Sequence, residues 1–590
     1  MLYFKNEQEK KLFFEVMARM DRSYDPDKRA LSSWRGENGY HSTLVNQTVH
    51  STRDSLTYAY ELLNRDADGD RERSADILRH IVPLQDTNPE NKTFGIWSYY
   101  IEEPLTQMSP PDWNWADFCG KELLRILLEH SEKLSADLIE LLRGALYNAC
   151  CSIRIRNMHP GYTNISVMGT YVTLVGGDYL GDESLVSYAL DRLKALYKYN
   201  IGKGSFDEYN SPTYTFTLVE DLACMMKTVT NPDALRMVRE LNSLAWKTIA
   251  EHYHFKTKQW AGPHARAYTM LQTKSLQLKI QRALDYRINL VDLSEEGVSD
   301  YLGISFFSID YSCPDEFVPY FTHSAGEVSV NKRVTNSEIA VSYMTDNYTI
   351  GNFWRSTFWN QRRNMLCYFG DESKPCYCAL RLLHDNFDYS SGSVVTAQQK
   401  NRAVSVIGFV TDGGDKHCSL DMVKNATIKA SDLRLRLEFG GDVDSLNIEK
   451  SGGEYIISGG GVKIRAAFPY ARFGDTDAPV IVGEESNHAE STGGKAHRSA
   501  IKYIDVVFYS GTETDIDFRQ LAECAVGLTF EITDGELSGD QPEAMRDGDI
   551  VTVTYGNLSA SGNVRALPTR ELNASFKAEI DGRGYSEIFK

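Results

Sequence analysis

The chain has 590 residues, which is too long for a single hydrophobic core and favours roughly two to four domains. Its formal net charge of −18 argues against a nucleic-acid-binding protein, and any polyanionic substrate would need a local basic cleft. No stretch approaches the ~18 consecutive apolar residues of a membrane-spanning helix, so no membrane association is expected.

Cofactor and metal motifs are missing from the sequence. It contains no HExxH motif, no Cys/His quartet, no Walker loop and no Rossmann fingerprint, so we expect neither a metal nor a cofactor. The ten cysteines have no metal-type spacing and are expected to be reduced. Residues 1–8 are charged and lack the apolar segment of a signal peptide, which predicts a cytoplasmic location unless a leader has been removed.

The first half of the chain has a helical pattern, from residue 7 to about residue 300. Leu56, Tyr60 and Leu63 recur at helical spacing, for example, and the pair Gly176-Gly177 after an apolar run predicts the end of a helix. Loops rich in Trp, Tyr, Asn, His and Gly separate the helices. Successive helices with such loops at one end predict an incomplete α/α toroid, in which helical hairpins collect their loops in one cleft.

The second half has the pattern of β-strands. Apolar and polar residues alternate in stretches such as Ala403–Phe409 and Leu433–Phe439, and Gly-rich turns separate them. Many short strands of this kind predict a large antiparallel β-sandwich. We therefore expect a toroid domain over residues 1–305 and a sandwich domain over residues 306–590, with a small separate β part at the C-terminal end as one option.

A polar and aromatic stretch, Gly204–Tyr214, lies between two helical runs. Loops on a rigid helical scaffold are common places for binding and catalysis. Its candidate functional side chains are Asp207, Glu208, Tyr209, Asn210 and Tyr214.

Two distant segments add an amide, an imidazole and a guanidinium, from Asn164, His264 and Arg266. This set fits β-elimination on a uronic-acid polysaccharide, because the C5 proton becomes acidic once the neighbouring carboxylate is neutralised. Asn164 and Arg266 can hydrogen-bond that carboxylate and stabilise the developing charge. A Tyr or His then removes the proton, and a Tyr can protonate the leaving glycosidic oxygen.

These segments resemble a known group of enzymes. Gly204-Ser205-Phe206-Asp207-Glu208-Tyr209 followed by Tyr214 is similar to the Gly-Ser-Phe-x-Gln-His…Tyr region of chondroitin AC, hyaluronate and xanthan lyases. Gly262–Arg266 is similar to their Gly-Arg-x-x-Ser-Arg segment, and Asn164 matches their carboxylate-neutralising Asn. The resemblance implies an incomplete α/α toroid followed by a β-sandwich, a plan that alginate and heparinase-type lyases share.

The sequence departs from these lyases at the expected base, where they have His and this chain has Tyr209. The group that removes the proton therefore stays open among Tyr209, Tyr214 and His264. Tyr214 is the first choice for the proton-transferring phenol.

Several further side chains are expected to bind the sugar chain. We expect two or three of the loop aromatics to face the cleft and stack on sugar rings. The aromatic candidates are Trp34, Trp97, Tyr99, Trp113 and Trp115, and the polar candidates are Arg35, His159 and Asn210. Trp359 and Arg362, in the second half, are expected at a lip that contacts substrate, with an inter-domain seam as the alternative.

The interpretation is a carbon–oxygen lyase that cleaves an acidic polysaccharide or oligosaccharide by β-elimination. One alternative is a glycoside hydrolase on the same toroid that uses Asp207 or Glu208 with a second carboxylate, for which Asp86 and Asp112 are candidates. The other alternative is a non-catalytic carbohydrate-binding protein that keeps the aromatic cleft.

Overall fold

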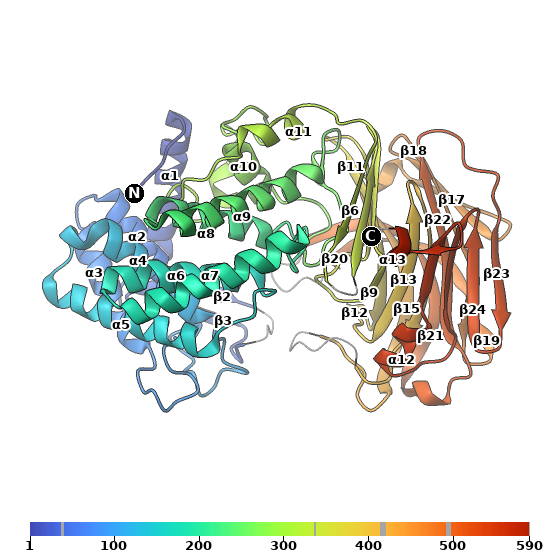
Figure 1. The fold of residues 1–590 in the computed structure, drawn as a ribbon, viewed down its shortest axis with the longest axis horizontal. Helices are drawn as coiled ribbons and strands as arrows, with labels where there is room; N and C mark the ends of the chain where they lie inside the picture. Colours follow the sequence, from blue (N-terminus) through green and yellow to red (C-terminus); the bar gives the residue numbers. More distant parts are fainter. Residues whose placement is uncertain (37–40, 336–337, 414–419, 491–496, 589–590) are drawn as a thin grey trace. The chain divides into compact units, whose positions relative to one another are not determined.

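The structure is a computed structural model, and it falls into two compact units (Figure 1). The described residues are 1–36, 41–335, 338–413, 420–490 and 497–588. The first unit, here called the helical unit, comprises Met1–Glu208, Tyr214–Lys247 and Thr273–Asp315. The second, called the sheet unit, comprises Tyr209–Thr213, Thr248–Gln272 and Glu316–Lys590.

The helical unit is built from consecutive helices and one small sheet. The helices are α1 (Glu7–Ser23), α2 (Thr52–Arg65), α3 (Asp70–Ile81), α4 (Trp115–His130), α5 (Ala136–Arg156), α6 (Thr163–Leu180), α7 (Glu183–Lys203), α8 (Tyr214–Thr228), α9 (Pro232–Glu251) and α10 (Lys274–Ala283). The residues of α9 from 248 onward belong to the sheet unit. The small antiparallel sheet consists of β1 (Tyr24–Asp25), β2 (Ala30–Arg35) and β3 (Gln47–Ser51).

Helices α2 to α8 form two layers. The inner layer is a row in which α2 contacts α4, α4 contacts α6, and α6 contacts α8, while α3, α5 and α7 form the outer row. Helices α2, α4 and α6 also pack against the outer helix that follows each of them, as in α4 with α5 and α6 with α7. Because the two helices of such a hairpin run in opposite directions, the inner helices all begin at the same end. This is the predicted α/α toroid plan.

The sequences of α6 and α7 explain their layers. Helix α6 has a single charged residue, Asp178, and every residue from Thr163 to Gly177 is buried. Helix α7 is amphipathic and buries one face, which includes Leu185, Ala189 and Leu193. A helix that is apolar all round belongs inside the structure, whereas an amphipathic helix covers it.

The predicted helix end at Gly176-Gly177 is wrong. Helix α6 continues to Leu180 and ends at Gly181, which has the left-handed φ of 73° typical of a helix C-terminus. The earlier glycines serve close packing instead. A Cβ atom at Gly177 would lie 2.9 Å from the Cβ of Leu185, and one at Gly176 would lie 3.2 Å from the Sγ of Cys150.

The sheet unit contains three large antiparallel sheets. The first has the order β20-β21-β15-β11-β10-β8-β7-β6, with β12 paired to β11. Its strands are β6 (Val328–Arg333), β7 (Ile339–Met344), β8 (Tyr348–Phe353), β10 (Met365–Gly370), β11 (Pro375–His384), β12 (Phe387–Asp388), β15 (Thr427–Gly441), β20 (Val480–Glu490) and β21 (His497–Asp517).

The second sheet has the order β16-β17-β18-β22-β14-β13-β9, with β19 paired to β18, and the third has the order β23-β24-β25-β26-β27. The strands of the second sheet are β9 (Arg355–Thr357), β13 (Gly392–Gln399), β14 (Arg402–Phe409), β16 (Asn447–Ser451), β17 (Glu454–Gly459), β18 (Val462–Phe473), β19 (Thr476–Asp477) and β22 (Cys524–Thr533). Those of the third are β23 (Pro542–Asp547), β24 (Ile550–Tyr555), β25 (Leu558–Asn563), β26 (Lys577–Ile580) and β27 (Arg583–Gly584). The unit also contains the hairpin β4 (Tyr253–His254) and β5 (Gln259–Trp260), and the short helices α11 (Pro319–Thr322), α12 (Thr569–Ser575) and α13 (Tyr585–Ile588).

The three sheets stack in layers around two cores. One core lies between the first and second sheets and includes Ile350, Leu435 and Ile407. The other lies between the second and third sheets and includes Val406 and Val553. The second sheet is therefore buried on both faces, which accounts for the nearly continuous apolar sequences of its central strands. The predicted order of a helical half followed by an antiparallel β-sandwich is confirmed.

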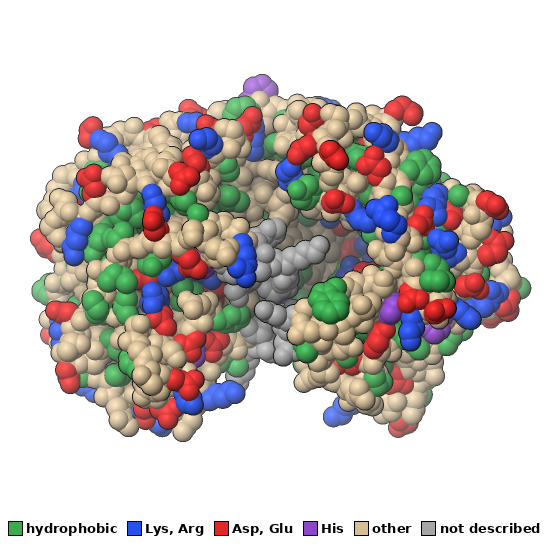
Figure 2. All heavy atoms as spheres, turned by 180° about the vertical axis from the view of Figure 1, so that it is seen from behind, with side chains coloured by type: hydrophobic (Ala, Val, Ile, Leu, Met, Phe, Trp, Pro, Cys, Tyr) green, Lys and Arg blue, Asp and Glu red, His purple; other side chains and the backbone are tan. Residues whose placement is uncertain are grey.

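Surface charge and helix hydropathy complete the description. Acidic and basic side chains are interspersed on the face that Figure 2 shows. Among the described residues, no helix combines the length and the apolar character needed to cross a membrane.

The close packing of α6 generates a stability prediction. A Cβ atom at Gly169 would lie 2.5 Å from Oδ1 of Asp117 in α4. We therefore expect Gly169→Ala to lower the free energy of unfolding by about 1–3 kcal/mol, measured by urea denaturation.

The matched control is Gly144→Ala, because no heavy atom lies within 4 Å of a Cβ built at this position in α5. This variant should be stabilised by up to about 1 kcal/mol, since alanine has the higher helix propensity. Equal stabilisation of both variants would contradict the close packing of α4 and α6.

Candidate functional site

The starts of the inner helices are joined by side-chain hydrogen bonds. Trp115, the first residue of α4, donates from Nε1 to Oγ1 of Thr52, the first residue of α2, over 3.1 Å. Asn114, directly before α4, donates from Nδ2 to the hydroxyl of Tyr162, directly before α6, over 3.2 Å. The inner layer therefore presents three helix starts side by side at one end of the helical unit.

Asn164 lies in the first turn of α6 and is buried. Its backbone N–H donates to Oε2 of Glu208 over 2.9 Å, and its side-chain Oδ1 accepts a hydrogen bond from the N–H of Ile165 over 2.5 Å. The free N–H groups at the start of a helix carry partial positive charge. Asn164 therefore lies at a positive helix end, where the Glu208 carboxylate already accepts one of the free N–H groups.

The two carboxylates of the central stretch have structural partners. Asp207 accepts a hydrogen bond from the hydroxyl of Tyr199 over 2.7 Å and forms an ion pair with Lys203. Glu208 is buried and satisfies the start of α6 through Asn164. These contacts favour a supporting role for both carboxylates.

The earlier carboxylates, Asp86 and Asp112, also accept hydrogen bonds from their own loops. Asp86 accepts from Oγ1 of Thr93 over 2.6 Å. Asp112 accepts from the hydroxyl of Tyr99 over 2.6 Å and from the N–H of Asn114 over 2.9 Å.

The predicted sugar-binding tryptophans differ widely in exposure. Trp97 is completely buried, and its Nε1 donates to the carbonyl of Val82 over 3.2 Å. Because neighbouring residues cover both faces of its ring, Trp97 is a core residue, contrary to the sequence expectation. Trp34, in β2, is 69% exposed and leaves its ring open to solvent.

The other loop aromatics lie at the start of α4. The rings of Tyr99 and Trp115 pack against each other with centroids 3.9 Å apart. Trp113 is half-buried, and its Nε1 donates to the carbonyl of Lys92 over 2.7 Å. These three residues form a half-buried aromatic surface beside the inner helix starts.

Arg35 and His159 are the polar candidates of the helical unit. Arg35 donates from Nε to the carbonyl of Leu44 over 2.6 Å and from its guanidinium to the hydroxyl of Tyr100 over 3.0 Å. These bonds hold the loop after β2. His159 is exposed, and its Nδ1 accepts from the N–H of Gly161 over 3.0 Å.

Arg156, at the end of α5, is a residue that the sequence reasoning missed. It donates to Oδ1 of Asn114 over 2.8 Å and to Oδ2 of Asp117 over 3.2 Å. Burial raises the pKa of Asp117 to about 7, although Arg156 and Arg192 act in the opposite direction. The available signal was a basic residue directly before the polar Asn157–Asn164 segment.

Tyr209 belongs to the sheet unit, where it is buried against His252. Its hydroxyl lies 2.9 Å from Nε2 of His252, whose Nδ1 donates to the carbonyl of Thr248 over 2.8 Å. The Tyr209 hydroxyl is therefore the donor in this pair. Burial raises the pKa of Tyr209 well above its ordinary value and lowers that of His252 to about 4. Both groups are neutral and internally paired, so Tyr209, one of the three candidates for the base, makes a structural contact in this arrangement.

Asn210 holds the next segment of the sheet unit instead of facing a substrate. Its Nδ2 donates to the carbonyls of Ala261 and Pro263 over 2.7 and 3.0 Å, and its Oδ1 accepts from the indole of Trp260. It is buried and has a left-handed φ of 51°, which Asn tolerates better than most residues. The expected substrate contact is thus replaced by a structural one.

His264 is also buried in the sheet unit. Its Nδ1 donates to the carbonyl of Asn210 over 2.5 Å, and its Nε2 is buried without a hydrogen-bond partner among the described residues. Burial lowers the pKa of His264 to about 3. A neutral imidazole of such low basicity is a poor general base near neutral pH.

Arg266, Trp359 and Arg362 lie together, although they come from distant parts of the sequence. The guanidinium carbons of Arg266 and Arg362 lie 5.1 and 6.0 Å from the centre of the Trp359 ring. Arg266 also donates from Nε to Oε1 of Gln361 over 2.9 Å. The sheet unit thus brings three predicted residues into one cationic and aromatic cluster.

Tyr214 is the first residue of α8 in the helical unit and is half-buried. Of the three candidates for proton transfer, it alone is not fully buried, since Tyr209 and His264 are each 1% exposed. Its role in proton transfer stays a prediction. No group of His, Cys, Asp and Glu side chains in the described ranges is arranged to hold a metal ion.

Comparisons with known proteins find one family model and several solved structures at low sequence identity. A family model described as a domain of unknown function, DUF8769, matches residues 10–283. No curated protein matches the chain. A heparinase III structure is similar over 87% of this chain and 82% of its own, with 9% identity and a TM-score of 0.41. A heparan sulfate lyase HepC mutant from Pedobacter heparinus is similar over 87% and 81%, with 9% identity and a TM-score of 0.34.

The buried histidines of the sheet unit predict loss of stability in acid. Burial lowers the pKa values of His252 and His254 to about 4 and that of His264 to about 3, from an ordinary 6.5. Below pH 6.5 the unfolded chain binds protons that the folded chain excludes. The free energy of unfolding should therefore fall as the pH decreases from 6.5 to about 4, by up to about 1.4 kcal/mol per pH unit and histidine.

Urea denaturation across this pH range measures the effect. His254→Gln should flatten the pH dependence, whereas His323→Gln, at an exposed position, should leave it unchanged. An unaltered slope in His254→Gln would show that His254 is already protonated in the folded protein.

Proposed function

We propose that the protein is a lyase that cleaves uronic-acid-containing polysaccharides or oligosaccharides by β-elimination. One observation carries the proposal. The starts of consecutive inner helices place Trp115, Asn164 and Tyr214 on helices that begin at the same end of the helical unit. An aromatic surface, an amide at a positive helix end and a half-buried phenol are the groups that such a reaction requires.

Carboxylate binding is the first requirement of the proposed reaction. The C5 proton of a uronate is weakly acidic until the negative charge of the C6 carboxylate is offset. Asn164, in the first turn of α6, lies at a helix end that favours negative charge. Donors fixed at this end would stabilise the enolate-like charge more than the ground-state carboxylate, which is the condition for lowering the barrier.

Proton transfer is the second requirement, and Tyr214 is the proposed group. The base removes the C5 proton, a C4–C5 double bond forms, and the bond from C4 to the glycosidic oxygen breaks. The leaving oxygen takes up one proton, so the reaction consumes no water and no net acid or base. A single phenol can accept the first proton as phenolate and return it to the leaving oxygen.

The roles of the sheet-unit residues follow from their contacts. Arg266 is proposed to supply a positive charge for the carboxylate, and Gln361 and Trp359 fix its orientation within the sheet unit. Tyr209 and Asn210 are proposed to hold the loop that precedes α8. Hydrolysis by Asp207 or Glu208 is less well supported, because Lys203 and the start of α6 already engage these carboxylates.

The elimination makes a spectroscopic prediction. The purified protein should raise the ultraviolet absorbance of at least one glycan among alginate, glucuronan, hyaluronan, chondroitin, heparin and xanthan, because elimination leaves an unsaturated uronyl end. Tyr214→Phe should reduce this rate by roughly 10²–10⁴-fold, the usual contribution of a general acid–base group. Tyr147→Phe, at a 43% exposed tyrosine of α5, should retain the rate.

The same assay separates the alternatives. A glycan whose uronate carboxyls have been reduced to alcohols should not be cleaved, because its C5 protons stay non-acidic. New reducing ends without ultraviolet absorbance would instead identify a hydrolase and shift attention to Asp207 and Glu208. Binding without either product would identify a non-catalytic carbohydrate-binding protein.

A further inference from the structure

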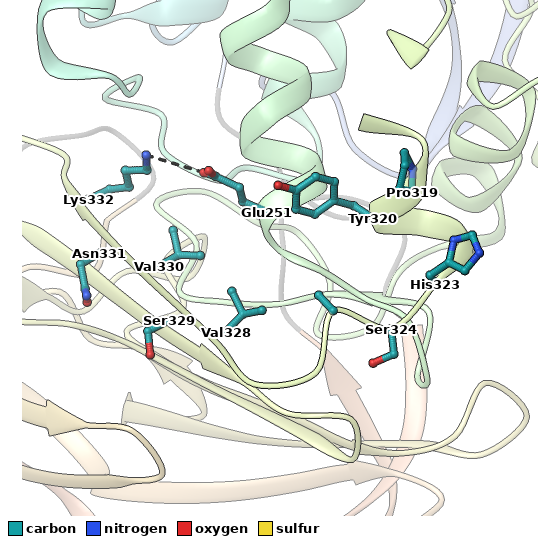
Figure 3. Close-up of a pocket in the computed structure, with 11 residues that line it drawn as sticks. Glu251, Pro319, Tyr320, His323, Ser324, Val328, Ser329, Val330, Asn331 and Lys332 are labelled. Atoms are coloured by element: carbon teal, nitrogen blue, oxygen red, sulfur yellow. Dashed lines mark ion pairs between the residues drawn. The ribbon is translucent and has the colours of Figure 1, made fainter. Parts of the chain in front are cut away.

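Strand β6 forms one end of the first sheet, and its outer edge is unpaired among the described strands. A pocket of about 540 Å³ is lined by every residue from Val328 to Lys332 (Figure 3). Successive side chains of a strand point to opposite faces. A pocket that touches consecutive residues therefore reaches the edge of the strand, and Glu251, Pro319, Tyr320 and His323 line it as well.

The register of the sheet shows which backbone groups of β6 face outward. The carbonyl of Ile339 in β7 accepts a hydrogen bond from the N–H of Trp354, so Ile339 faces β8 and the next residue, Ala340, faces β6. Ala340 is opposite Lys332. By alternation, Val328, Val330 and Lys332 pair with β7, while the N–H and C=O groups of the odd-numbered residues Ser329, Asn331 and Arg333 point to the outer edge.

The side chains on β6 leave this edge open. Edge strands are often protected by a lysine whose charge would be buried by pairing. Here Lys332 is directed toward Glu251 over the face of the sheet, with Nζ and Oε2 3.6 Å apart (Figure 3). Its charge is already offset, so a strand added at the edge would not have to bury an unpaired ammonium group.

The sequence of this edge is complementary to itself. In an antiparallel pair of two β6 strands centred on Val330, Ser329 of each copy lies opposite Asn331 of the other. Both residues have outward backbone groups, so each pair can exchange two hydrogen bonds. In the same register, Glu327 lies opposite Arg333 on the exposed face, which places opposite charges together at both ends.

We propose that the protein forms a two-fold symmetric dimer in which the β6 edges of two copies pair and join their first sheets into one. A second copy of this chain would thus occupy the edge pocket. Glu327 is available for the new contact, because its present ion pair with Lys400 lies at the surface, where such pairs contribute little. The dimer does not depend on the proposed lyase activity, because its test measures the molar mass of the protein and not its catalytic rate.

Light scattering during size-exclusion chromatography, over a series of protein concentrations, tests the dimer. The full chain should approach twice its mass of 66.6 kDa at high concentration. Asn331→Pro should remain at the mass of one chain with an unchanged melting temperature, because it removes only an outward N–H group. Val330→Pro should instead lower the melting temperature, since its N–H belongs to the ladder with β7.

Charge reversal provides the decisive control. Glu327→Arg should weaken the dimer at least tenfold by facing Arg333 with a like charge, and the double variant Glu327→Arg/Arg333→Glu should restore it. Three results would each overturn the proposal: one-chain mass for the native protein at every concentration, an unchanged dimer in Asn331→Pro, or no restoration in the double variant.

Discussion

The burial of helix α6 is the constraint on which the helical unit depends. This helix contacts α4, α5, α7 and α8, so it has no face left for charged side chains and carries glycines where neighbours approach most closely. A buried helix start also needs acceptors for its free N–H groups. Glu208 is the acceptor for the N–H of Asn164, and this hydrogen bond fixes the segment before α8 against the start of α6. Packing thus determines where the candidate site lies.

The central stretch Gly204–Tyr214 is stabilised by ion pairs and a helix start in its first part and by buried hydrogen bonds in its second part. Up to Glu208 it is held within the helical unit by ion pairs and by the start of α6, and from Tyr209 to Thr213 it belongs to the sheet unit. There, the pair of Tyr209 with His252 and the bonds from Asn210 satisfy buried polar groups that would otherwise cost about 1–3 kcal/mol each. The clustering of these polar residues in the sequence suggests catalysis. In the structure, their polar groups form the hydrogen bonds that hold a loop.

Periodicity made the architecture predictable, while contacts between distant segments did not follow from it. The nearly uncharged sequence of α6 and the alternating strands after residue 310 predict the layers directly. In contrast, the partner of Tyr209 lies 43 residues away, and the cluster of Arg266 with Trp359 joins segments whose pairing no local pattern specifies. The exposure of single residues was equally unpredictable, since Trp97 and Trp34 occur in similar polar and aromatic stretches of sequence but only Trp34 is open to solvent. The predicted helix end at Gly177 was wrong because this glycine allows close helix packing and does not end the helix.

The net charge of −18 is compatible with an acidic substrate because local charge differs from the total. At the inner helix starts, the helix dipoles and the arginine side chains contribute positive charge. Arg53 stacks 4.0 Å from the ring centre of Phe118, and Arg156 bonds to Asn114 directly before α4. Arg53 is oriented by an aromatic ring, Arg156 by an amide and by the carboxylate of Asp117, and the helix ends add fixed partial charges that lose no side-chain entropy on binding. Such a preorganised positive end can attract a carboxylate even in a strongly acidic protein, whereas salt would weaken the attraction only over distances beyond about 8–10 Å.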